Sequence, residues 1–380
     1  MAARGRMIAA TFVFCSLILP LLSSASKTTT PYPNVVNSPS DDLKQNDEPQ
    51  MRLLLDNESS DENANENEAN GDKFEVKLVE NAPQGLIEGF YQKHCPRAEQ
   101  IVTKLLMKAL QRDYTLGPSI VRLFTHDCLV KGCDASILLE NTPEGQFKVE
   151  KNSAINKPFI RGYEVIYEMK AKLEAECPGI VSCADILAFA NRDALVHAGV
   201  PTYKVAAGRR DGLSSLATNV MNNVPLLNTP AQGIIEIFDR KGLTLEDMIV
   251  LDGAHSIGRA HCVNVIPRIS DESKCREMDP SYVDHLRSMC ANINNTVPLD
   301  PVTPNKMDAR IYDEFLSNRA VLPPDDTLAK DSNSNAIMKK LAGDQEGWLA
   351  KFVTAVIKMG EIEVLTGDKG EIRKDCRAVN

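Results

Sequence analysis

The sequence predicts an all-α protein in which many helices are joined by long loops, and three observations support this fold class. In "PRAEQIVTKLLMKALQR", apolar residues recur at helical spacing after Pro96, a residue that favours the first turn of a helix. A second apolar stripe with this period runs from Trp348 to Met359. Segments with the alternating pattern of strands are few, and no internal repeat is present.

The N-terminus has the pattern of a cleaved secretory signal. Arg4 and Arg6 precede the apolar run "MIAATFVFCSLILPLL", which is followed by small residues up to Ser26. An uncleaved membrane anchor is the alternative, but the run is shorter than the ~20 residues that a spanning helix needs. We therefore expect residues 1–26 to be removed, and no later segment is apolar enough to cross a membrane.

Residues 27–85 form an acidic, low-complexity leader that we expect to be disordered. Residues 27–80 contain thirteen Asp and Glu against five Lys and Arg, a balance of minus eight. The whole chain has a formal net charge of −9, and two positive charges lie in the signal, so about minus three is left for residues 81–380. The folded part has no basic patch with interleaved aromatic residues, and we expect no nucleic-acid partner.

Capping signals predict two more helices. Ser182 with Asp185 resembles a capping box ahead of "CADILAFANRDALVHAG", and Gly199 marks the end of that helix. Thr244 with Asp247 repeats the signature before "MIVLDGAHSIG".

An arginine and a histidine lie one helical turn apart in "SIVRLFTHDC". If this segment is helical, Arg122 and His126 project from one face, while Asp127 points elsewhere. A neutral imidazole can move a proton between two atoms of a substrate, and a guanidinium can stabilise the charge that develops. Taken alone, the pair is also compatible with a structural histidine.

The residues after this pair predict a cation site. Cys128 and Cys133 are close enough for a tight disulfide loop, and Asp127, Asp134 and Ser136 offer hard oxygen ligands, which suit calcium. A zinc site built from the nearby histidine and the two thiols is the alternative, but it would require reduced cysteines.

A chain that enters the secretory pathway can keep disulfides, and this chain has ten cysteines. Cys15 lies in the signal, so nine remain, and at least one of these is unpaired or forms an intermolecular bond. The glycosylation sequons at Asn57 and Asn294 fit the same compartment.

Together these motifs resemble the secreted haem peroxidases of plants, the class III peroxidase family. The similarity follows the family's order and spacing through "GFYQKHCP", "VRLFTHDCLVKGCDASILL", "VSCADILAFANRDA", "GRRDG", "DMIVLDGAHSIGRAHC" and "IRKDCRAVN". It covers nearly all of residues 86–380 and implies a peroxidase domain of two mainly helical halves, distal and proximal, with a haem b buried between them. Within this family the chain is a divergent member.

The resemblance also implies four disulfides, namely Cys95–Cys177, Cys128–Cys133, Cys183–Cys376 and Cys262–Cys290. Each such bond typically contributes ~2–4 kcal/mol, mostly by restricting the unfolded chain. Cys275 is left over, and a free thiol, a shuffled bond, a cross-linked dimer and an inert buried thiol all stay open.

The same resemblance assigns the haem ligand and its partner. His255 in "LDGAHSIG" aligns with the axial ligand, and Asp325 in "VLPPDDTL" aligns with the carboxylate that accepts a hydrogen bond from its other ring nitrogen.

On the distal side, Asn156 aligns with the amide that holds His126 in its basic tautomer, and Glu150 with the acid behind that amide. His126 would move a proton between the two oxygens of hydrogen peroxide while Arg122 stabilises the leaving charge. Two one-electron oxidations of a donor would follow, and Pro225 aligns with the backbone site that contacts phenolic donors.

Two calcium ions are implied by the resemblance. The distal positions are Asp127, Val130, Gly132, Asp134 and Ser136, with the valine and the glycine acting through their carbonyls. The proximal positions are Ser256, Asp300, Thr303 and Asp308, with Lys306 joining through its carbonyl if at all. The proximal segment "DPVTPNKMD" is only a loose match to the family.

Two positions depart from the family pattern. Thr125 stands where the family has an aromatic residue, which should open space above the iron or admit a water and so permit larger substrates or reduce oxidative efficiency. Pro324 replaces the usual serine before Asp325 and Asp326, which leaves open which aspartate reaches His255.

The sequence thus predicts a secreted, monomeric haem peroxidase of the apoplast or cell wall. One haem b and two calcium ions are its expected cofactors, and hydrogen peroxide, small phenolic donors and cell-wall polymers are its expected partners. A secreted pseudo-peroxidase, acting as a cell-wall binding or structural module, is the alternative from another class. It is disfavoured because a packing role would not need Arg122, His126, Asn156, His255 and Asp325 together. An intracellular haem peroxidase is disfavoured by the signal and the cysteines.

Overall fold

The computed structural model describes residues 85–142, 145 and 148–380, and helices dominate this part of the chain. The predicted signal and nearly all of the acidic leader, with the sequon at Asn57, lie outside the described residues. The first elements are α1 (Ala98–Arg112), α2 (Leu116–Lys131), η1 (Ser136–Leu138), η3 (Glu150–Asn152), α3 (Tyr163–Glu176), α4 (Cys183–His197) and α5 (Ala217–Asn223).

The second half of the domain is also mainly helical. Its elements are α6 (Ala231–Arg240), α7 (Leu245–Asp252), η4 (Gly253–Ser256), β1 (Arg259–His261), α8 (Cys262–Ile269), α9 (Glu272–Cys275), α10 (Pro280–Met289), β2 (Thr296–Pro298), α11 (Arg310–Leu316), α12 (Pro323–Lys330), α13 (Ser332–Leu341) and α14 (Gln345–Met359). The strands β1 and β2 pair antiparallel, with Ala260 opposite Val297. The predicted all-α fold class is therefore confirmed, with one short two-stranded ladder added.

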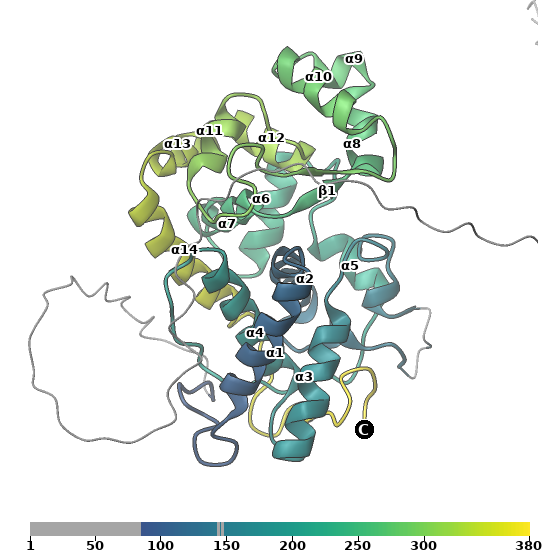
Figure 1. The fold of residues 1–380 in the computed structure, drawn as a ribbon, viewed down its shortest axis with the longest axis vertical. Coiled ribbons are helices and arrows are strands. Elements are labelled where there is room, and N and C mark those ends of the chain that lie inside the picture. The colour runs from purple at the N-terminus through teal and green to yellow at the C-terminus, as the bar shows by residue number, and fades with distance from the viewer. Residues whose placement is uncertain (1–84, 143–144, 146–147) are drawn as a thin grey trace, which may run out of the picture. The chain divides into compact units, whose positions relative to one another are not determined.

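Helix α4 lies at the centre of the first half. Helices α1, α2 and α3 pack against it, as Figure 1 shows in the lower part of the view. Twelve of its fifteen residues are buried, so it contacts protein on nearly every side. Helix α14 contacts both α2 and α7, and it thereby joins the first half of the domain to the second.

The predicted helix of residues 96–112 begins slightly later than expected. Helix α1 starts at Ala98, so Pro96 precedes the helix and is not in its first turn. Its apolar face is buried as predicted, with Val102 and Leu106 both inaccessible to solvent. The C-terminal stripe from Trp348 to Met359 is likewise the buried face of α14.

The capping signals have different outcomes at the two helices. At α7 the box is complete, because the Thr244 hydroxyl accepts the N–H of Asp247 and the Asp247 carboxylate accepts the N–H of Thr244. At α4 only one half forms: Ser182 Oγ accepts the N–H of Asp185 at 3.1 Å. The Asp185 carboxylate instead accepts hydrogen bonds from the Tyr91 hydroxyl at 2.7 Å and from distant backbone, so tertiary partners displace the local one.

Helices α8, α9 and α10 form a separate small cluster with β1 and β2, seen at the top of Figure 1. Its core includes Val265, Tyr282 and Leu286, which are each at most 3% exposed. The disulfide between Cys262 and Cys290 links the start of α8 to the end of α10. This cluster follows directly after the segment that carries His255.

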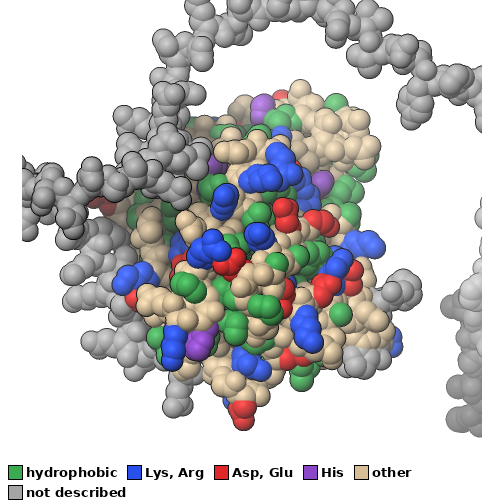
Figure 2. All heavy atoms as spheres, turned by 60° about the horizontal axis from the view of Figure 1, so that its bottom comes forward, with side chains coloured by type: hydrophobic (Ala, Val, Ile, Leu, Met, Phe, Trp, Pro, Cys, Tyr) green, Lys and Arg blue, Asp and Glu red, His purple; other side chains and the backbone are tan. Residues whose placement is uncertain are grey.

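All four predicted disulfides are present, namely Cys95–Cys177, Cys128–Cys133, Cys183–Cys376 and Cys262–Cys290. Cys275 is a free, half-buried thiol. Among the described residues, none of the helices is both long and apolar enough to span a bilayer. Figure 2 shows one face of the molecule, on which basic and acidic side chains are interspersed.

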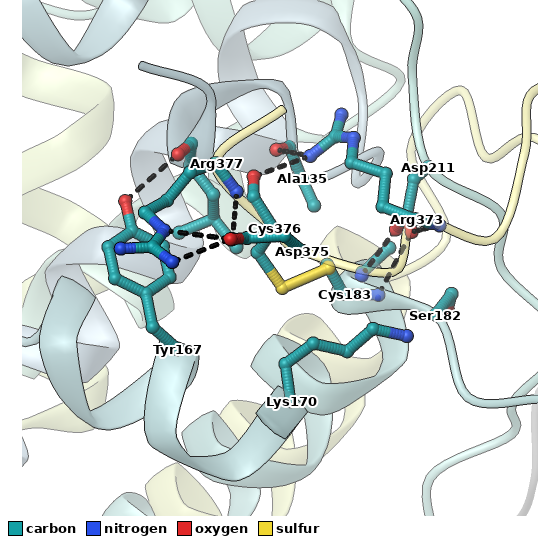
Figure 3. Close-up of a disulfide and its surroundings, with 12 residues drawn as sticks. Ala135, Tyr167, Lys170, Ser182, Cys183, Asp211, Arg373, Asp375, Cys376 and Arg377 are labelled. Atoms are coloured by element: carbon teal, nitrogen blue, oxygen red, sulfur yellow. Dashed lines mark hydrogen bonds and ion pairs between the residues drawn. A yellow bond between two sulfur atoms is a disulfide. The ribbon is translucent and has the colours of Figure 1, made fainter. Parts of the chain in front are cut away.

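The C-terminal segment is anchored to the first half of the domain, as Figure 3 shows. The disulfide between Cys183 and Cys376 joins it to the start of α4. Beside this bond, the fully buried Arg373 donates from Nη1 to the carbonyl of Ala135 at 2.8 Å, and its backbone N–H donates to Asp211 at 3.0 Å. Asp211 also accepts the N–H of Cys183 at 3.1 Å, so one carboxylate fixes the C-terminal segment and the N-terminus of α4.

Candidate active site

Helix α2 carries the predicted arginine and histidine. The segment is helical over Leu116–Lys131, so Arg122 and His126 lie one turn apart on one face. Asp127 faces away from His126, because its carboxylate accepts the N–H groups of Ala135 at 2.9 Å and Ile137 at 3.3 Å. The distal histidine therefore takes its hydrogen-bond partner from elsewhere in the fold.

That partner is Asn156. His126 Nδ1 lies 2.9 Å from Asn156 Oδ1, and the Asn156 amide nitrogen donates to the backbone carbonyl of Glu150 at 2.8 Å. Since the amide nitrogen is engaged with a carbonyl, the oxygen of Asn156 faces the ring and accepts from it. The proton of neutral His126 is then on Nδ1, and Nε2 is left as a base.

Glu150 takes part in this chain through its backbone. The resemblance assigns it as the acid behind the amide, but the contact with Asn156 uses its carbonyl oxygen. Its carboxyl group accepts instead from the Ser136 hydroxyl at 3.3 Å, and burial raises the pKa of this carboxyl to about 8.

His126 is held neutral by its surroundings. Burial, together with the positive charge of Arg122, lowers the pKa of His126 to about 3, and the hydrogen bond with Asn156 offsets this only in part. The Nε2 lone pair is therefore available throughout the physiological pH range.

The predicted proximal histidine lies on the short helix η4 (Gly253–Ser256). Its Nδ1 lies 3.1 Å from Asp325 Oδ1, on α12, and Asp325 is almost completely buried. Asp326, the other aspartate that the sequence left open, instead pairs with Arg268 at 3.0 Å and Lys330 at 2.9 Å. Burial alone would lower the pKa of His255, but the carboxylates of Asp325 and Asp252 raise it to about 9.

Arg122 and His255 are both partly accessible to solvent although protein surrounds them. The Arg122 side chain is exposed, yet burial lowers its pKa. The side chain of His255 is 35% exposed, although desolvation is the strongest single influence on its pKa. Both observations hold when a side chain is surrounded by protein but lines a water-accessible space. The charge of Arg122 also acts on His126 and on His255, so the three groups surround the same region.

This arrangement fits a haem group. The candidate ligand is the imidazole of His255, whose Nδ1 is held by a buried carboxylate and whose Nε2 has no hydrogen bond to the described residues. Histidine in metal sites is commonly held in this way by a carboxylate or carbonyl. On the other side, His126 is oriented by Asn156 and is available for proton transfer.

The distal oxygen groups lie together, and the charges of Lys131 and Arg373 oppose only in part the rise in the pKa of Asp134. Asp127, Asp134 and Ser136 are all at most 3% exposed, and Glu150 joins them through Ser136. Burial and mutual repulsion raise the pKa of Asp127 well above its usual range, and burial also raises the pKa of Asp134. Buried carboxylates at such density are costly unless a cation neutralises them, so the donor set fits calcium.

The two predicted carbonyl ligands flank this cluster. The Val130 carbonyl accepts from Lys241 Nζ at 3.3 Å. Gly132 ends α2 with a φ of 89°, and a Cβ there would come within 2.7 Å of the backbone of Ile362 and Glu363. Only glycine suits this turn, which brings the loop back toward Asp134.

The predicted proximal oxygen groups also lie together. Asp300 accepts the Thr303 N–H at 3.0 Å, and the Thr303 hydroxyl lies 3.1 Å from Asp300 Oδ2 and 3.1 Å from Asp308 Oδ1. Ser256 is fully buried and donates to Met307 Sδ at 3.4 Å. The ammonium of Lys306 lies 3.8 Å from Asp308, so part of this negative charge is already balanced by the protein.

Two further positions were predicted to belong to the site. Thr125 is half-buried between Phe124 and His126, and its hydroxyl donates to the Val121 carbonyl at 3.0 Å. Because the hydroxyl is bound within the helix, the side chain presents no free donor. Pro225 is half-buried in the loop between α5 and α6.

The sequence reasoning missed three groups near this site. Asp252 lies 3.5 Å from Nδ1 of His255, and its i, i+3 spacing from the histidine was the available signal. The buried hydroxyl of Tyr163 has no hydrogen-bond partner among the described residues, and its electrostatic interaction with Arg122 raises the pKa of that arginine. His261 stacks obliquely on Phe159, with ring centroids 5.3 Å apart, and burial and Arg122 lower its pKa.

Comparisons with known proteins agree with this geometry. The family model described as peroxidase matches residues 102–344. The chain is 40% identical over 300 residues to "Peroxidase 5" of Vitis vinifera, covering 77% of this chain and 91% of the relative. It is 39% identical over 303 residues to "Peroxidase 15" of Arabidopsis thaliana, covering 78% and 89%. It is 40% identical over 304 residues to "Peroxidase 44" of the same plant, covering 79% and 95%.

Proposed function

The chain belongs to the plant class III peroxidase family and is a peroxidase, and from this premise we propose that it is a secreted enzyme that reduces hydrogen peroxide while oxidising phenolic donors. One observation carries the proposal: two histidines are held at Nδ1 by different partners, His126 by the amide oxygen of Asn156 at 2.9 Å and His255 by the carboxylate of Asp325 at 3.1 Å. His126 has its pKa lowered to about 3, and His255 has its pKa raised to about 9. Such a division assigns one ring to proton transfer and the other to ligation.

The family implies haem, and we assign His255 Nε2 as its axial ligand. When bound, haem supplies the redox centre that accepts the oxidising equivalents of peroxide and passes them to donors one electron at a time. Asp325 holds the Nδ1 proton of His255, which fixes the ring and makes Nε2 more electron-rich.

The distal residues then manage the proton. His126 Nε2 takes a proton from one oxygen of hydrogen peroxide and returns it to the other, which leaves as water. Asn156 keeps Nδ1 protonated, so the ring cannot accept the proton at the wrong nitrogen. Arg122 carries no ion-pair partner among the described residues, and its charge stabilises the oxygen that leaves. Over the full cycle, one hydrogen peroxide and two phenols give two waters and two phenoxyl radicals.

Two calcium ions would stabilise this geometry. The distal ion would be held at the C-terminal end of the helix that carries His126, by Asp127, Asp134 and Ser136 and by the carbonyls of Val130 and Gly132. The proximal ion is held by Ser256, Asp300, Thr303 and Asp308, and Ser256 is adjacent to His255. Each site would therefore adjoin one of the two histidines.

We further propose that the enzyme domain spans residues 86–380, behind a cleaved signal (1–26) and an acidic leader (27–85). Secretion to the apoplast or cell wall is supported by the N-terminal pattern and by the four disulfides. We expect a monomer. Pro225 is the expected carbonyl contact for phenolic donors, and cell-wall phenols are the expected polymeric substrates. A non-catalytic wall protein is not favoured, because the His126–Asn156–Glu150 chain serves no packing need.

A pair of variants tests this division of roles. Haem is titrated into the purified protein, and the absorption change on adding one equivalent of hydrogen peroxide is followed by stopped flow. We expect His255→Ala to lose the five-coordinate haem spectrum, and His126→Ala to keep it but react with peroxide ~10²- to 10⁴-fold more slowly. His197→Ala is the matched control: this exposed histidine at the end of α4 takes no part in the site, and its loss should keep both the haem spectrum and the rate. A wild-type protein that does not bind haem, or an unimpaired His126→Ala, would contradict the proposal.

A further inference from the structure

Asp252 has none of the usual structural roles of an aspartate at its position. It ends α7 and directly precedes η4, where a short acidic side chain often caps the next helix. Here the side chain forms no cap, and its buried Oδ2 has no hydrogen-bond partner among the described residues. Leaving a buried acceptor unsatisfied is unfavourable, so packing and capping do not account for this residue.

The nearest charged partner of Asp252 is the ring of His255. Asp252 Oδ1 lies 3.5 Å from Nδ1, and Asp325 Oδ1 lies 3.1 Å from the same nitrogen. The three side chains form a compact group, with their polar atoms within 4.8 Å of one another. Only the contact with Asp325 has the length of a good hydrogen bond, so Asp252 acts on the ring mainly through its charge.

The surroundings of Asp252 keep this effect strong. Its side chain is only 12% exposed, and a Cβ on the adjacent Gly253 would come within 3 Å of the Tyr312 hydroxyl and the Trp348 ring, so protein packs closely against this part of the backbone. The hydroxyl of Tyr312 donates to the Ile249 carbonyl and is thus not available to Asp252. Burial and repulsion from Asp325 raise the pKa of Asp252, while the positive charge of His255 opposes this rise. The charge of Asp252 is thus sustained by the ring of His255, on which it acts at short range.

We propose that Asp252 is a second positioning residue for His255, a carboxylate that acts together with Asp325 on the Nδ1 side of the ring and strengthens Nε2 as a donor to the haem iron. This inference rests on the proposed haem function. A ring polarised by two carboxylates is more electron-rich than a ring polarised by one, and it favours the oxidised state of the bound iron.

The test is the midpoint potential of the ferric–ferrous couple, measured by spectroelectrochemistry on the haem-loaded full chain. Asp252→Asn removes the charge and keeps the shape, and Asp252→Ser removes both. We expect both variants to shift the potential upward, by less than Asp325→Asn does, because the contact of Asp252 is longer. Asp326→Asn is the matched control: it removes a carboxylate from the next position, which pairs with Arg268 and Lys330, and should leave the potential close to wild type.

A second readout keeps the test independent of activity and of folding failure. Thermal unfolding of the haem-free protein should show Asp252→Asn at least as stable as wild type, since an unsatisfied carboxylate is removed. In the ferrous enzyme, the iron–histidine stretching frequency should fall in the Asp252 variants.

The outcomes separate this inference from the proposed function. A shift in Asp325→Asn with none in either Asp252 variant overturns the role of Asp252 and leaves the haem assignment intact. An equal shift in Asp326→Asn overturns it as well, because any nearby charge would then suffice. A wild-type protein that binds no haem overturns both.

Discussion

The pH dependence of the reaction with peroxide follows from the environment of His126. The difference between an ordinary histidine pKa of 6.5 and the value of about 3 corresponds to about 5 kcal/mol against the protonated ring. At pH 5 an ordinary histidine would be only about 3% neutral, whereas His126 is about 99% neutral. If Nε2 is the base, the second-order rate constant with hydrogen peroxide at pH 5 should equal its value at pH 7.

The assay is a stopped-flow pH jump. The haem-loaded enzyme is kept at neutral pH and mixed with peroxide in buffers down to pH 2.5, so that the rate is recorded before acid unfolding. We expect a flat profile from pH 7 to about pH 4 and a loss of about tenfold per pH unit below 3. Arg122→Leu removes the second-largest cause of the lowered pKa and should move the inflection upward, in addition to slowing the reaction. Arg161→Leu is the control, since this exposed arginine pairs with Asp113 and does not contribute to the pKa of His126.

An inflection near pH 6.5 in the wild-type profile would refute the reasoning, because the ring would then be solvated and not enclosed. An unchanged inflection in Arg122→Leu would show that burial alone sets the pKa.

Three other predictions concern the surrounding structure. Chelation of calcium, or Asp134→Ala, should slow the reaction with peroxide by roughly tenfold or more by loosening the end of α2; loss of calcium, measured by atomic absorption, with an unchanged rate would contradict the distal assignment. The double variant Cys183→Ala, Cys376→Ala opens a loop that the disulfide closes over 193 residues. In the chain-entropy description, this should lower the free energy of unfolding, measured by urea titration, by about 5 kcal/mol. A loss under about 1 kcal/mol would mean that Arg373 and Asp211 hold the C-terminal segment without the bond. Thr125→Phe fills space beside His126 and should lower kcat/KM for bulky phenols several-fold more than for phenol itself, whereas equal effects on both donors would exclude a role of Thr125 in donor size.

Local patterns predicted the features that depend on neighbouring residues. The period of α1 and α14, the complete capping box at Thr244 and the shared face of Arg122 and His126 all follow from spacings of three or four residues. The local pattern did not predict the hydrogen-bond partner of a side chain that can reach residues distant in sequence. The Asp185 carboxylate does not complete its capping box but accepts a hydrogen bond from the hydroxyl of Tyr91, which lies 94 residues away in sequence.

The active site shows the same contrast between contacts that local patterns predict and contacts between distant residues. The resemblance to a family identified His255 and Asp325, but their contact spans 70 residues and could not be derived from the residues alone. The part of Glu150 that meets Asn156 is its carbonyl, which no sequence pattern distinguishes from its carboxyl. Asp252 was missed because an aspartate between two helices is usually explained as a helix cap. The structure excludes that explanation, since the side chain forms no cap and one of its oxygens is unsatisfied.

The anchoring of the C-terminal segment to the start of α4 sets an order of events during synthesis. At ~5–20 residues per second, Cys376 leaves the ribosome some 10–40 s after Cys183. During that interval Cys183 has no correct partner, while Cys177 lies six residues before it and Cys95 is already exposed to it. The first half of the domain also lacks Arg373, which binds the Ala135 carbonyl between the predicted calcium ligands Asp134 and Ser136. A cell that makes this protein must therefore shield or reshuffle the early thiols until the last residues arrive, and disulfide isomerase capacity should limit its yield.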